Sequence, residues 1–189
     1  PGDAVFVDLN GDGVLNGDDA TRDIGFTDIP EYTAGLNLGF SWKNFDFSMQ
    51  WTGAWNVDRM LSEFRRPLGD TNSKALLLYQ YETTWRSSED TFTAKFPRAS
   101  NSHASNNYRG TDLYLINASY LRLKNVEIGY NFDFPFMKKM KLDNCRLYIN
   151  GYNLLTITGF DWGDPESRQS DRPNYPLTRV FNIGLKVGF

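Results

Sequence analysis

Alternation of apolar and polar side chains along the C-terminal segment is the feature that most constrains the fold of this chain. In Arg179–Phe189 every second position is large and apolar, and the positions between carry asparagine, glycine or lysine. A period of two places successive side chains on opposite sides of a strand. The segment is therefore predicted to be a strand with one hydrophobic and one polar face. Its apolar set is Phe181, Ile183, Leu185, Val187 and Phe189.

The same alternation recurs upstream, on both sides of a very short turn at Lys43-Asn44. Strands of about ten residues have the length that a tilted strand needs to cross a bilayer core. Aromatic residues stand near both ends of these segments, where membrane barrels carry their interfacial girdles. A β-sandwich has the same alternation with its apolar face inside, so the pattern alone leaves both architectures open. The apolar sets are Tyr32, Ala34, Leu36, Leu38, Phe40 and Trp42 before the turn, and Phe45, Phe47, Met49, Trp51 and Trp55 after it.

Two further strands are predicted at about Leu113–Phe132 and Arg146–Thr158. In the first of these the apolar set changes parity, which indicates a β-bulge near Lys124-Asn125. The connections between the five predicted strands are the short turn, a very long segment at 57–112, a shorter one at 133–145 and a long one at 159–178. Bacterial outer-membrane barrels keep short turns on the periplasmic side and long loops outside. We therefore predict an all-β fold: C-terminal strands of a large antiparallel transmembrane β-barrel, with both long loops extracellular.

Five strands are too few to close such a barrel, because the smallest membrane barrels need about eight. Open strand edges in lipid would leave backbone groups without hydrogen-bond partners. The chain is thus expected to be the C-terminal piece of a larger protein or one chain of a composite barrel. In this division, residues 1–29 form an extracellular loop with a calcium-type turn, and residues 30–189 form the barrel strands and their loops.

The calcium-type turn is the segment Asp8–Asp19, which matches the loop template of the EF-hand. Oxygen-bearing side chains stand at alternate positions, and Gly13 permits the sharp turn. A hard cation takes about six to eight oxygen ligands, so alternate residues must point inward. We expect a structural calcium ion, with a solvated Asx/Gly turn as the alternative. The expected ligands are Asp8, Asn10, Asp12, the carbonyl of Val14, Asn16 and Asp19.

Composition argues against some other functions. A net charge of −3 disfavours a nucleic-acid-binding surface, so no nucleic-acid partner is expected. The single histidine, His103, lies in a Ser/Asn-rich segment without a fixed nucleophile and orienting group nearby in the sequence. We therefore expect that the protein is not an enzyme.

Several ordered segments together resemble the SusC/RagA family of TonB-dependent outer-membrane transporters of Bacteroidetes. The resemblance covers nearly the whole chain. Asp161–Glu166 is similar to a shorter loop motif of the family, but its spacing differs and we assign it no role. The segments that carry the resemblance are Asp8–Asp19, Ser119–Val126 with Gly129-Tyr130, Arg146–Ile149 with Asn153–Thr156, and Tyr175–Leu177 before the terminal strand.

The resemblance implies a barrel of about 22 strands, of which this chain would supply the last five. It also implies a plug domain, which this chain lacks, energy from TonB, and a SusD-like surface lipoprotein as partner. The implied function is import of a nutrient, glycan or peptide, across the outer membrane. A passive porin or secretion channel and a soluble calcium- and glycan-binding β-domain are the alternatives.

Substrate contacts are expected from aromatic side chains in or beside the long loops. Such rings can stack on sugars or pack against a lipoprotein lid, although they can equally bury one another within folded loops. A short amphipathic helix is also predicted over Lys74–Arg86 from the spacing of Leu77, Tyr81 and Trp85. The expected substrate-contacting residues are Trp85, Tyr108, Tyr114, Phe160 and Trp162.

Overall fold

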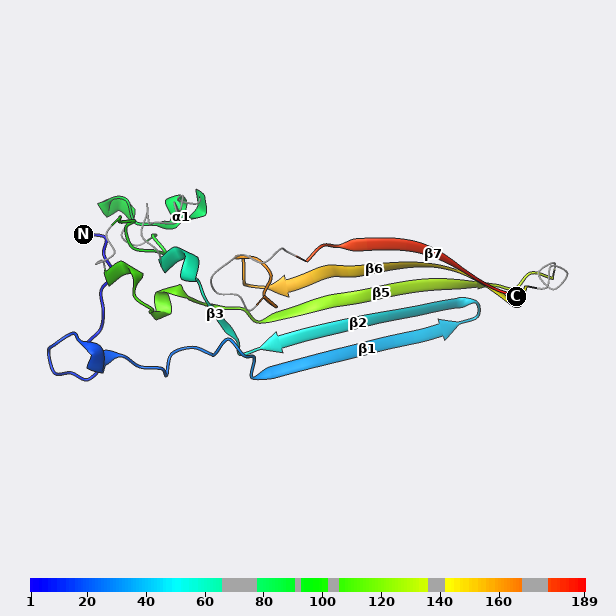
Figure 1. Ribbon diagram of the computed structural model, residues 1–189, viewed down its shortest axis with the longest axis horizontal. Helices are drawn as coiled ribbons and strands as arrows, with labels where there is room; N and C mark the ends of the chain where they lie inside the picture. The colour runs from blue at the N-terminus through cyan, green and yellow to red at the C-terminus, as the bar shows by residue number, and fades with distance from the viewer. Residues whose placement is uncertain (66–77, 91–92, 102–105, 136–141, 168–176) are drawn as a thin grey trace. The chain divides into compact units, whose positions relative to one another are not determined.

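The fold is given by a computed structural model of the chain (Figure 1). It describes residues 1–65, 78–90, 93–101, 106–135, 142–167 and 177–189. Within this part the chain divides into two compact units. The first is built from Pro1–Asp28 and Asp58–Asn117, and the second from Ile29–Val57, Ala118–Ser167 and the described C-terminal residues 177–189.

The second unit is a five-stranded sheet in which every neighbouring pair is antiparallel. The order across the sheet is β1-β2-β5-β6-β7 (Figure 1). The strands are β1 (Tyr32–Trp42), β2 (Phe45–Trp55), β5 (Tyr120–Phe132), β6 (Asn144–Thr158) and β7 (Val180–Gly188). Because all connections join antiparallel neighbours, the segments that follow β2 and β6 leave from the same end of the sheet.

The cross-strand register gathers the alternating apolar side chains on one face. Leu36 pairs with Trp51, Trp51 with Leu123, and Leu123 with Leu155. Paired residues of neighbouring strands share a face, so an apolar row crosses the sheet. The polar residues between them, such as Asn37 and its partner Gln50, occupy the other face. We name these two surfaces the apolar face and the polar face.

The predicted bulge lies in β5 at Lys124. The pairing of β2 with β5 shifts between Gln50 and Trp51, and the pairing of β5 with β6 shifts between Leu123 and Asn125. The extra residue returns Val126 to the same face as Leu123, which corrects the change of parity. In β6, opposite this shift, Asn153 adopts a left-handed φ of 53°.

The predicted strand at Leu113–Phe132 is wrong at its start. Residues Asp112–Tyr114 form a 3-10 turn, and Leu115–Asn117 form the short strand β4, which pairs with β3 (Asp58–Met60) in the first unit. Alternation cannot separate these elements, because three residues are too few to show a period. The other four strands are confirmed to within two residues at each end.

The first unit is built mainly from short helical turns around a small core. Its elements are η1 (Gly17–Asp19), η2 (Ser62–Arg65), α1 (Leu78–Thr83), η3 (Ser88–Asp90), η4 (Asn106–Tyr108) and η5 (Asp112–Tyr114), with β3 and β4. The rings of Phe96 and Tyr114 stack at 5.7 Å in this core, with Leu61 also buried. In the described part of the chain, no helix is long and apolar enough to cross a membrane.

The helix predicted over Lys74–Arg86 is shorter at its C-terminal end than expected. α1 ends at Thr83, and the amide of Trp85 donates to the carbonyl of Phe96 at 2.9 Å, so Trp85 lies beyond the helix. Residues 74–77 fall outside the described part of the chain.

Asn107 attaches the N-terminal residues to the rest of the first unit. Its side chain, 1% exposed, accepts from the amide of Ala4 at 2.8 Å and donates to Asp3 Oδ1 at 2.8 Å. Arg98 completes the attachment through paired hydrogen bonds from Nε (2.7 Å) and Nη2 (3.1 Å) to the Asp3 carboxylate. The Arg98 guanidinium, followed by the Asn107 amide, lowers the pKa of Asp3 below its usual 3.8.

Replacing Asn107 with alanine is expected to release the N-terminal segment while leaving the five-stranded sheet intact. Each lost hydrogen bond is worth about 1 kcal/mol, and a buried partner left unsatisfied costs more. Amide hydrogen exchange of the full-length protein should show faster exchange at Ala4, whose amide donates to the Asn107 side chain. Asn106→Ala is the matched control, because its side chain is exposed on the same turn. Equal acceleration in both variants would contradict the assignment.

Candidate functional site

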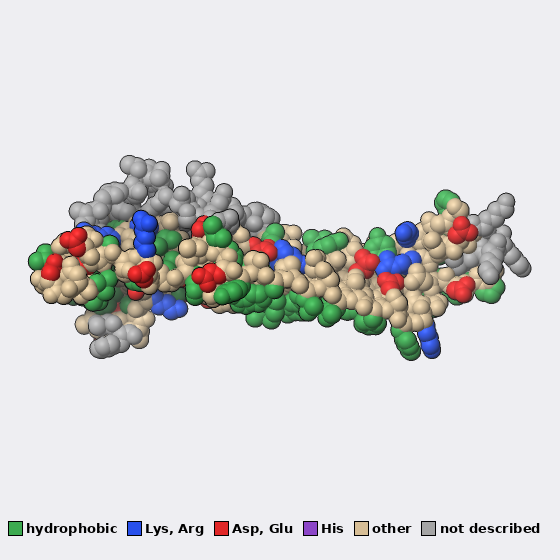
Figure 2. Space-filling model, turned by 90° about the horizontal axis from the view of Figure 1, so that it is seen from below, with side chains coloured by type: hydrophobic (Ala, Val, Ile, Leu, Met, Phe, Trp, Pro, Cys, Tyr) green, Lys and Arg blue, Asp and Glu red, His purple; other side chains and the backbone are tan. Residues whose placement is uncertain are grey.

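The apolar face of the sheet carries large side chains that remain exposed. Phe40 is 63% exposed, Phe181 and Ile183 are each 72% exposed, and Ile149 is 55% exposed. Figure 2 shows hydrophobic side chains gathered in a band along one side of the sheet. A sandwich would bury these groups against a second layer at about 10 Å. Their exposure argues against the soluble sandwich and leaves a large apolar surface that water does not favour.

Aromatic rings cluster at the end of the sheet that carries the Lys43-Asn44 turn. Phe45 lies 4.7 Å from Tyr130, Tyr130 lies 5.0 Å from Phe132, and Phe132 lies 5.4 Å from Phe134, measured between ring centroids. Close to the same turn, Lys43 Nζ stands 4.8 Å over the ring of Trp42. Tyr130 and Trp42 have amphipathic rings, and such rings beside a cation suit the headgroup level of a bilayer.

The polar face holds one ion network near this same end. Arg146 donates from Nε to Asp46 Oδ1 at 3.0 Å and from Nη2 to Glu127 Oε1 at 2.7 Å, with a further close contact to Asp46 Oδ2. Asn150 donates to Glu127 at 3.3 Å, and Asn182 donates to Asn150 at 2.9 Å. The network therefore links β2, β5, β6 and β7 across the polar face.

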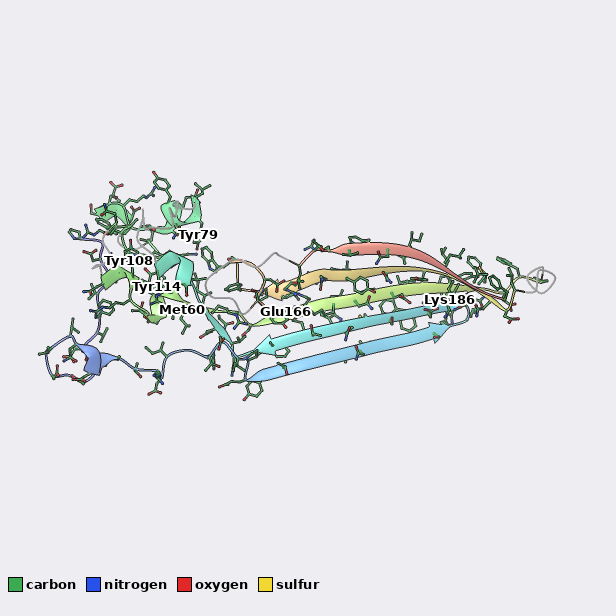
Figure 3. The ribbon with its side chains drawn as sticks, in the orientation of Figure 1. Met60, Tyr79, Tyr108, Tyr114, Glu166 and Lys186 are labelled. Carbon is green, nitrogen blue, oxygen red and sulfur yellow. The ribbon has the colours of Figure 1, made fainter. Side chains whose placement is uncertain are left out.

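A second ion network lies toward the opposite end, where the segment after β6 folds back onto the polar face. Arg122, whose side chain is 3% exposed, donates to Glu166 Oε2 at 2.6 Å and to Asp164 Oδ1 at 2.9 Å. Lys124 donates to the same Glu166 oxygen at 2.8 Å, and the Tyr120 hydroxyl donates to Glu166 Oε1 at 2.8 Å. Figure 3 shows Glu166 beside the end of β6 and Lys186 toward the other end of the sheet.

The sequence analysis missed this second network. Arg122 is recognisable as a polar-face residue from its parity, but its partners lie more than forty positions away. The alternate acidic residues Asp164 and Glu166 were the available signal. They lie in Asp161–Glu166, the segment to which we assigned no role from the sequence.

The predicted calcium ligands close the Asp8–Asp19 loop through hydrogen bonds to its own backbone. The carboxylate of Asp8 accepts from the amides of Gly11 and Gly13 at 2.6 and 2.8 Å. That of Asp19 accepts from Leu9 and Asn16, both at 2.9 Å. These backbone bonds, that of Asn16 foremost, lower the pKa of Asp19, so its carboxylate is ionised at neutral pH. In the described part of the chain, no three His, Cys, Asp or Glu side chains form a metal-holding group.

The remaining predicted ligands take part in the same bonding. Asn10 Oδ1 accepts from Asp12 N at 2.8 Å, Asp12 Oδ1 from Val14 N at 2.7 Å, and Asn16 Oδ1 from Asp18 N at 2.6 Å. A carboxylate has about four acceptor positions, so one amide bond to an oxygen leaves room for a cation. The donor set, carboxylates with amide and carbonyl oxygens, is the chemistry that calcium takes.

The five predicted substrate-contacting aromatics are not equally accessible. Tyr114 is 2% exposed and Phe160 is 8% exposed, so both pack within the described structure. The Tyr114 hydroxyl donates to the Asn107 carbonyl at 2.5 Å, and burial raises its pKa to about 12. A substrate contact by either ring would require rearrangement of its surroundings.

The other three aromatics are half-buried, and their role as substrate contacts stays a prediction. Trp85 packs where a Cβ on Gly2 would meet its ring, and the Tyr108 hydroxyl donates to the Ser100 carbonyl at 2.6 Å. Trp162 lies in the segment that bears the second ion network. His103 falls outside the described residues.

The chain is similar along its whole length to several curated proteins that share one description. The chain is 31% identical over its whole length to TonB-dependent receptor P3 and 28% identical to TonB-dependent receptor P26, both of Formosa agariphila. It is 25% identical to the TonB-dependent receptor SusC of Bacteroides thetaiotaomicron. It spans about a fifth of the length of these curated relatives: 19%, 20% and 18%. No family model matches the chain.

Solved structures agree at the level of the fold. The chain superposes on a structure of the RagAB peptide transporter with a TM-score of 0.68 at 22% identity, over 93% of this chain and 19% of that chain. For the RagAB peptide importer in its closed-closed state the TM-score is 0.67 at 21% identity, over 94% and 20%. The chain is thus similar throughout to TonB-dependent receptors. Within that class, its resemblance to the SusC/RagA family is confirmed.

The facing of the terminal strand can be tested with a pair of adjacent substitutions. Ile183→Lys, on the apolar face, is expected to impair membrane assembly of the full-length protein, at a cost of about 2–4 kcal/mol if the residue lies near the bilayer midplane. Asn182→Lys, on the polar face, loses one hydrogen bond and is expected to assemble. Heat-modifiable migration of the outer-membrane fraction measures assembly. Equal defects in the two variants would refute the facing assignment.

Proposed function

We propose that this chain is the C-terminal part of the barrel wall of an outer-membrane transporter, which imports a nutrient with energy from TonB. The single observation that carries the proposal is the exposed apolar face, laid out by register over five strands. Similarity along the whole chain to TonB-dependent receptors supports it. Residues 30–189 would supply the last strands, and the long segments after β2 and β6 would be extracellular.

The lipid contact follows from the arrangement of side chains. An apolar face of this extent is stable in contact with acyl chains, and the aromatic cluster beside Lys43 suits the interface. The polar face, with its ion networks, then faces the interior of the barrel. A soluble calcium- and glycan-binding domain would have to keep the same side chains in water, so this alternative is disfavoured.

The cargo proposed is a peptide or an oligosaccharide. The RagAB structures are named for peptide transport, which favours a peptide, whereas the loop aromatics would also suit sugar rings. A SusD-like surface lipoprotein is the proposed partner at the extracellular mouth. The relatives and solved structures that the chain matches are named as receptors and transporters, which supports a transport role rather than an enzymatic one.

A transport assay tests this function. Cells that produce the full-length protein should accumulate radiolabelled casein peptides or mixed plant oligosaccharides, and uptake should stop when tonB is deleted. The passive porin alternative predicts uptake that persists without TonB and leakage of the same probes from liposomes that contain the purified protein. Uptake of neither probe pool in cells with TonB would contradict nutrient import of these two classes.

We also propose that Asp8–Asp19 binds calcium as a structural clip on the extracellular side. Its affinity could be as weak as about 10⁻⁴ to 10⁻³ M, as in other extracellular modules. The ion would neutralise the three carboxylates of Asp8, Asp12 and Asp19, which the chain holds within one short loop. The loop's own hydrogen bonds already place these groups on a closed turn.

Asp12→Asn is expected to weaken calcium binding by about tenfold, because it removes one of three ligand charges. Asp18→Asn is the charge-matched control, since Asp18 is not at a ligand position of the template. Equilibrium dialysis of the full-length protein with radioactive calcium measures both variants. Loss of the same number of bound ions in the two variants, or no saturable binding by the wild type up to about 10 mM, would contradict the site.

A further inference from the structure

The second ion network fixes a loop segment to strand β5. Gly159–Ser167 leaves β6 and returns to the polar face, where Asp164 and Glu166 meet side chains of β5. Three donors at alternate positions of β5 converge on these two carboxylates. They are Tyr120, Arg122 and Lys124. Because two cations face two carboxylates, the charges of the network cancel.

The network is protected from water at its centre. The Arg122 side chain is 3% exposed and that of Asp164 is 10% exposed. Arg122, on β5, also donates from Nε to Thr156 Oγ1 on β6 at 2.9 Å. The guanidinium is therefore held by β6 as well as by the loop. A planar guanidinium held at three points is preorganised, so the carboxylates that bind it are fixed in direction as well as distance.

Hydrogen bonds also constrain the segment on both sides of Trp162. On one side, Phe160 is buried, and its amide donates to Thr158 Oγ1 at 3.1 Å. On the other, Asp164 Oδ1 accepts from the amide of Glu166 at 2.9 Å, and the Asp164 carbonyl accepts from Ser167 at 2.9 Å. The backbone at Trp162 is therefore constrained two residues before and two residues after the indole.

We propose that Arg122 is a positioning residue: through Asp164 and Glu166 it holds the Gly159–Ser167 segment on the polar face, so that Trp162 is fixed as an aromatic contact for the imported substrate. This inference rests on the proposed import function. It assigns to Arg122 no contact with substrate. The substrate class that suits a fixed indole is one with a flat or apolar face, such as a sugar ring or a peptide side chain.

The first arm of the test measures the loop directly. A nitroxide spin label is attached at Asp161→Cys in full-length protein whose other cysteines are replaced. Arg122→Met should shorten the rotational correlation time of the label at least about threefold, since the two carboxylates lose their shared donor. Arg122→Lys should restore part of the difference by keeping the charge. Arg146→Met is the matched control, because it breaks the other network on the same face and should leave this label unchanged.

The second arm measures transport with whichever probe pool, casein peptides or plant oligosaccharides, is taken up by the wild type. Arg122→Met and Trp162→Ala should each raise the apparent KM about threefold or more, with maximal rate per assembled molecule preserved. The double variant should be no worse than Trp162→Ala alone, because the two residues act through one contact.

The outcomes separate the two proposals. An unchanged spin label in Arg122→Met, or additive KM effects in the double variant, would overturn the positioning role. Absence of uptake in the wild type would overturn the proposed import. The spin-label experiment would still show whether Arg122 holds the loop, because it does not depend on transport. If Arg122→Met does not assemble, two other variants test the role. Arg122→Lys should loosen the label in part, and the double variant Asp164→Asn with Glu166→Gln should loosen it fully.

Discussion

The cross-strand register is the constraint on which the rest of the structure depends. A shift by one residue in any strand would move its whole apolar set to the other face. Two features hold the register where alternation alone would fail. The bulge at Lys124 absorbs the change of parity within β5, and the Arg146 network joins four strands through side chains of the polar face. The bulge and the Arg146 network both agree with the backbone pairing, so each face carries mainly one kind of side chain.

This uniformity connects the fold to its proposed setting. A soluble sheet of this kind would cover its apolar side, and here that side stays open while the polar side is crossed by ion networks. The distribution of side chains is therefore the reverse of that in a globular protein, where apolar side chains are covered and charged ones are exposed. The same reversal explains why the buried Arg122 lies on the polar face. Its charge is paired by the carboxylates of Asp164 and Glu166, both in the returning loop, which lowers the cost of removing it from water.

The sequence predicts the parts of this structure that repeat and fails where structure depends on distant partners. Period-two alternation located β1, β2, β6 and β7, and the parity change at Leu123 and Val126 located the bulge. Short elements such as β4 are not predicted, because three residues are too few to show a period. The burial of Tyr114 and Phe160 and the pairing of Arg122 with Glu166 are set by contacts across tens of residues, which local pattern does not encode. The closed hydrogen bonding of Asp8–Asp19 agrees with the loop template, whereas calcium itself stays a prediction.

The balance of charge on the polar face has a consequence for selectivity. In the described part of the polar face, the ion pairs join three cations, Arg122, Lys124 and Arg146, to four carboxylates, Asp46, Glu127, Asp164 and Glu166. Paired charges of this kind produce little net potential at distances beyond about 10 Å, so this part of the proposed wall would neither draw in nor repel a charged cargo over a longer range. In the proposed importer, discrimination between acidic, basic and neutral cargo would then depend on groups outside these paired charges.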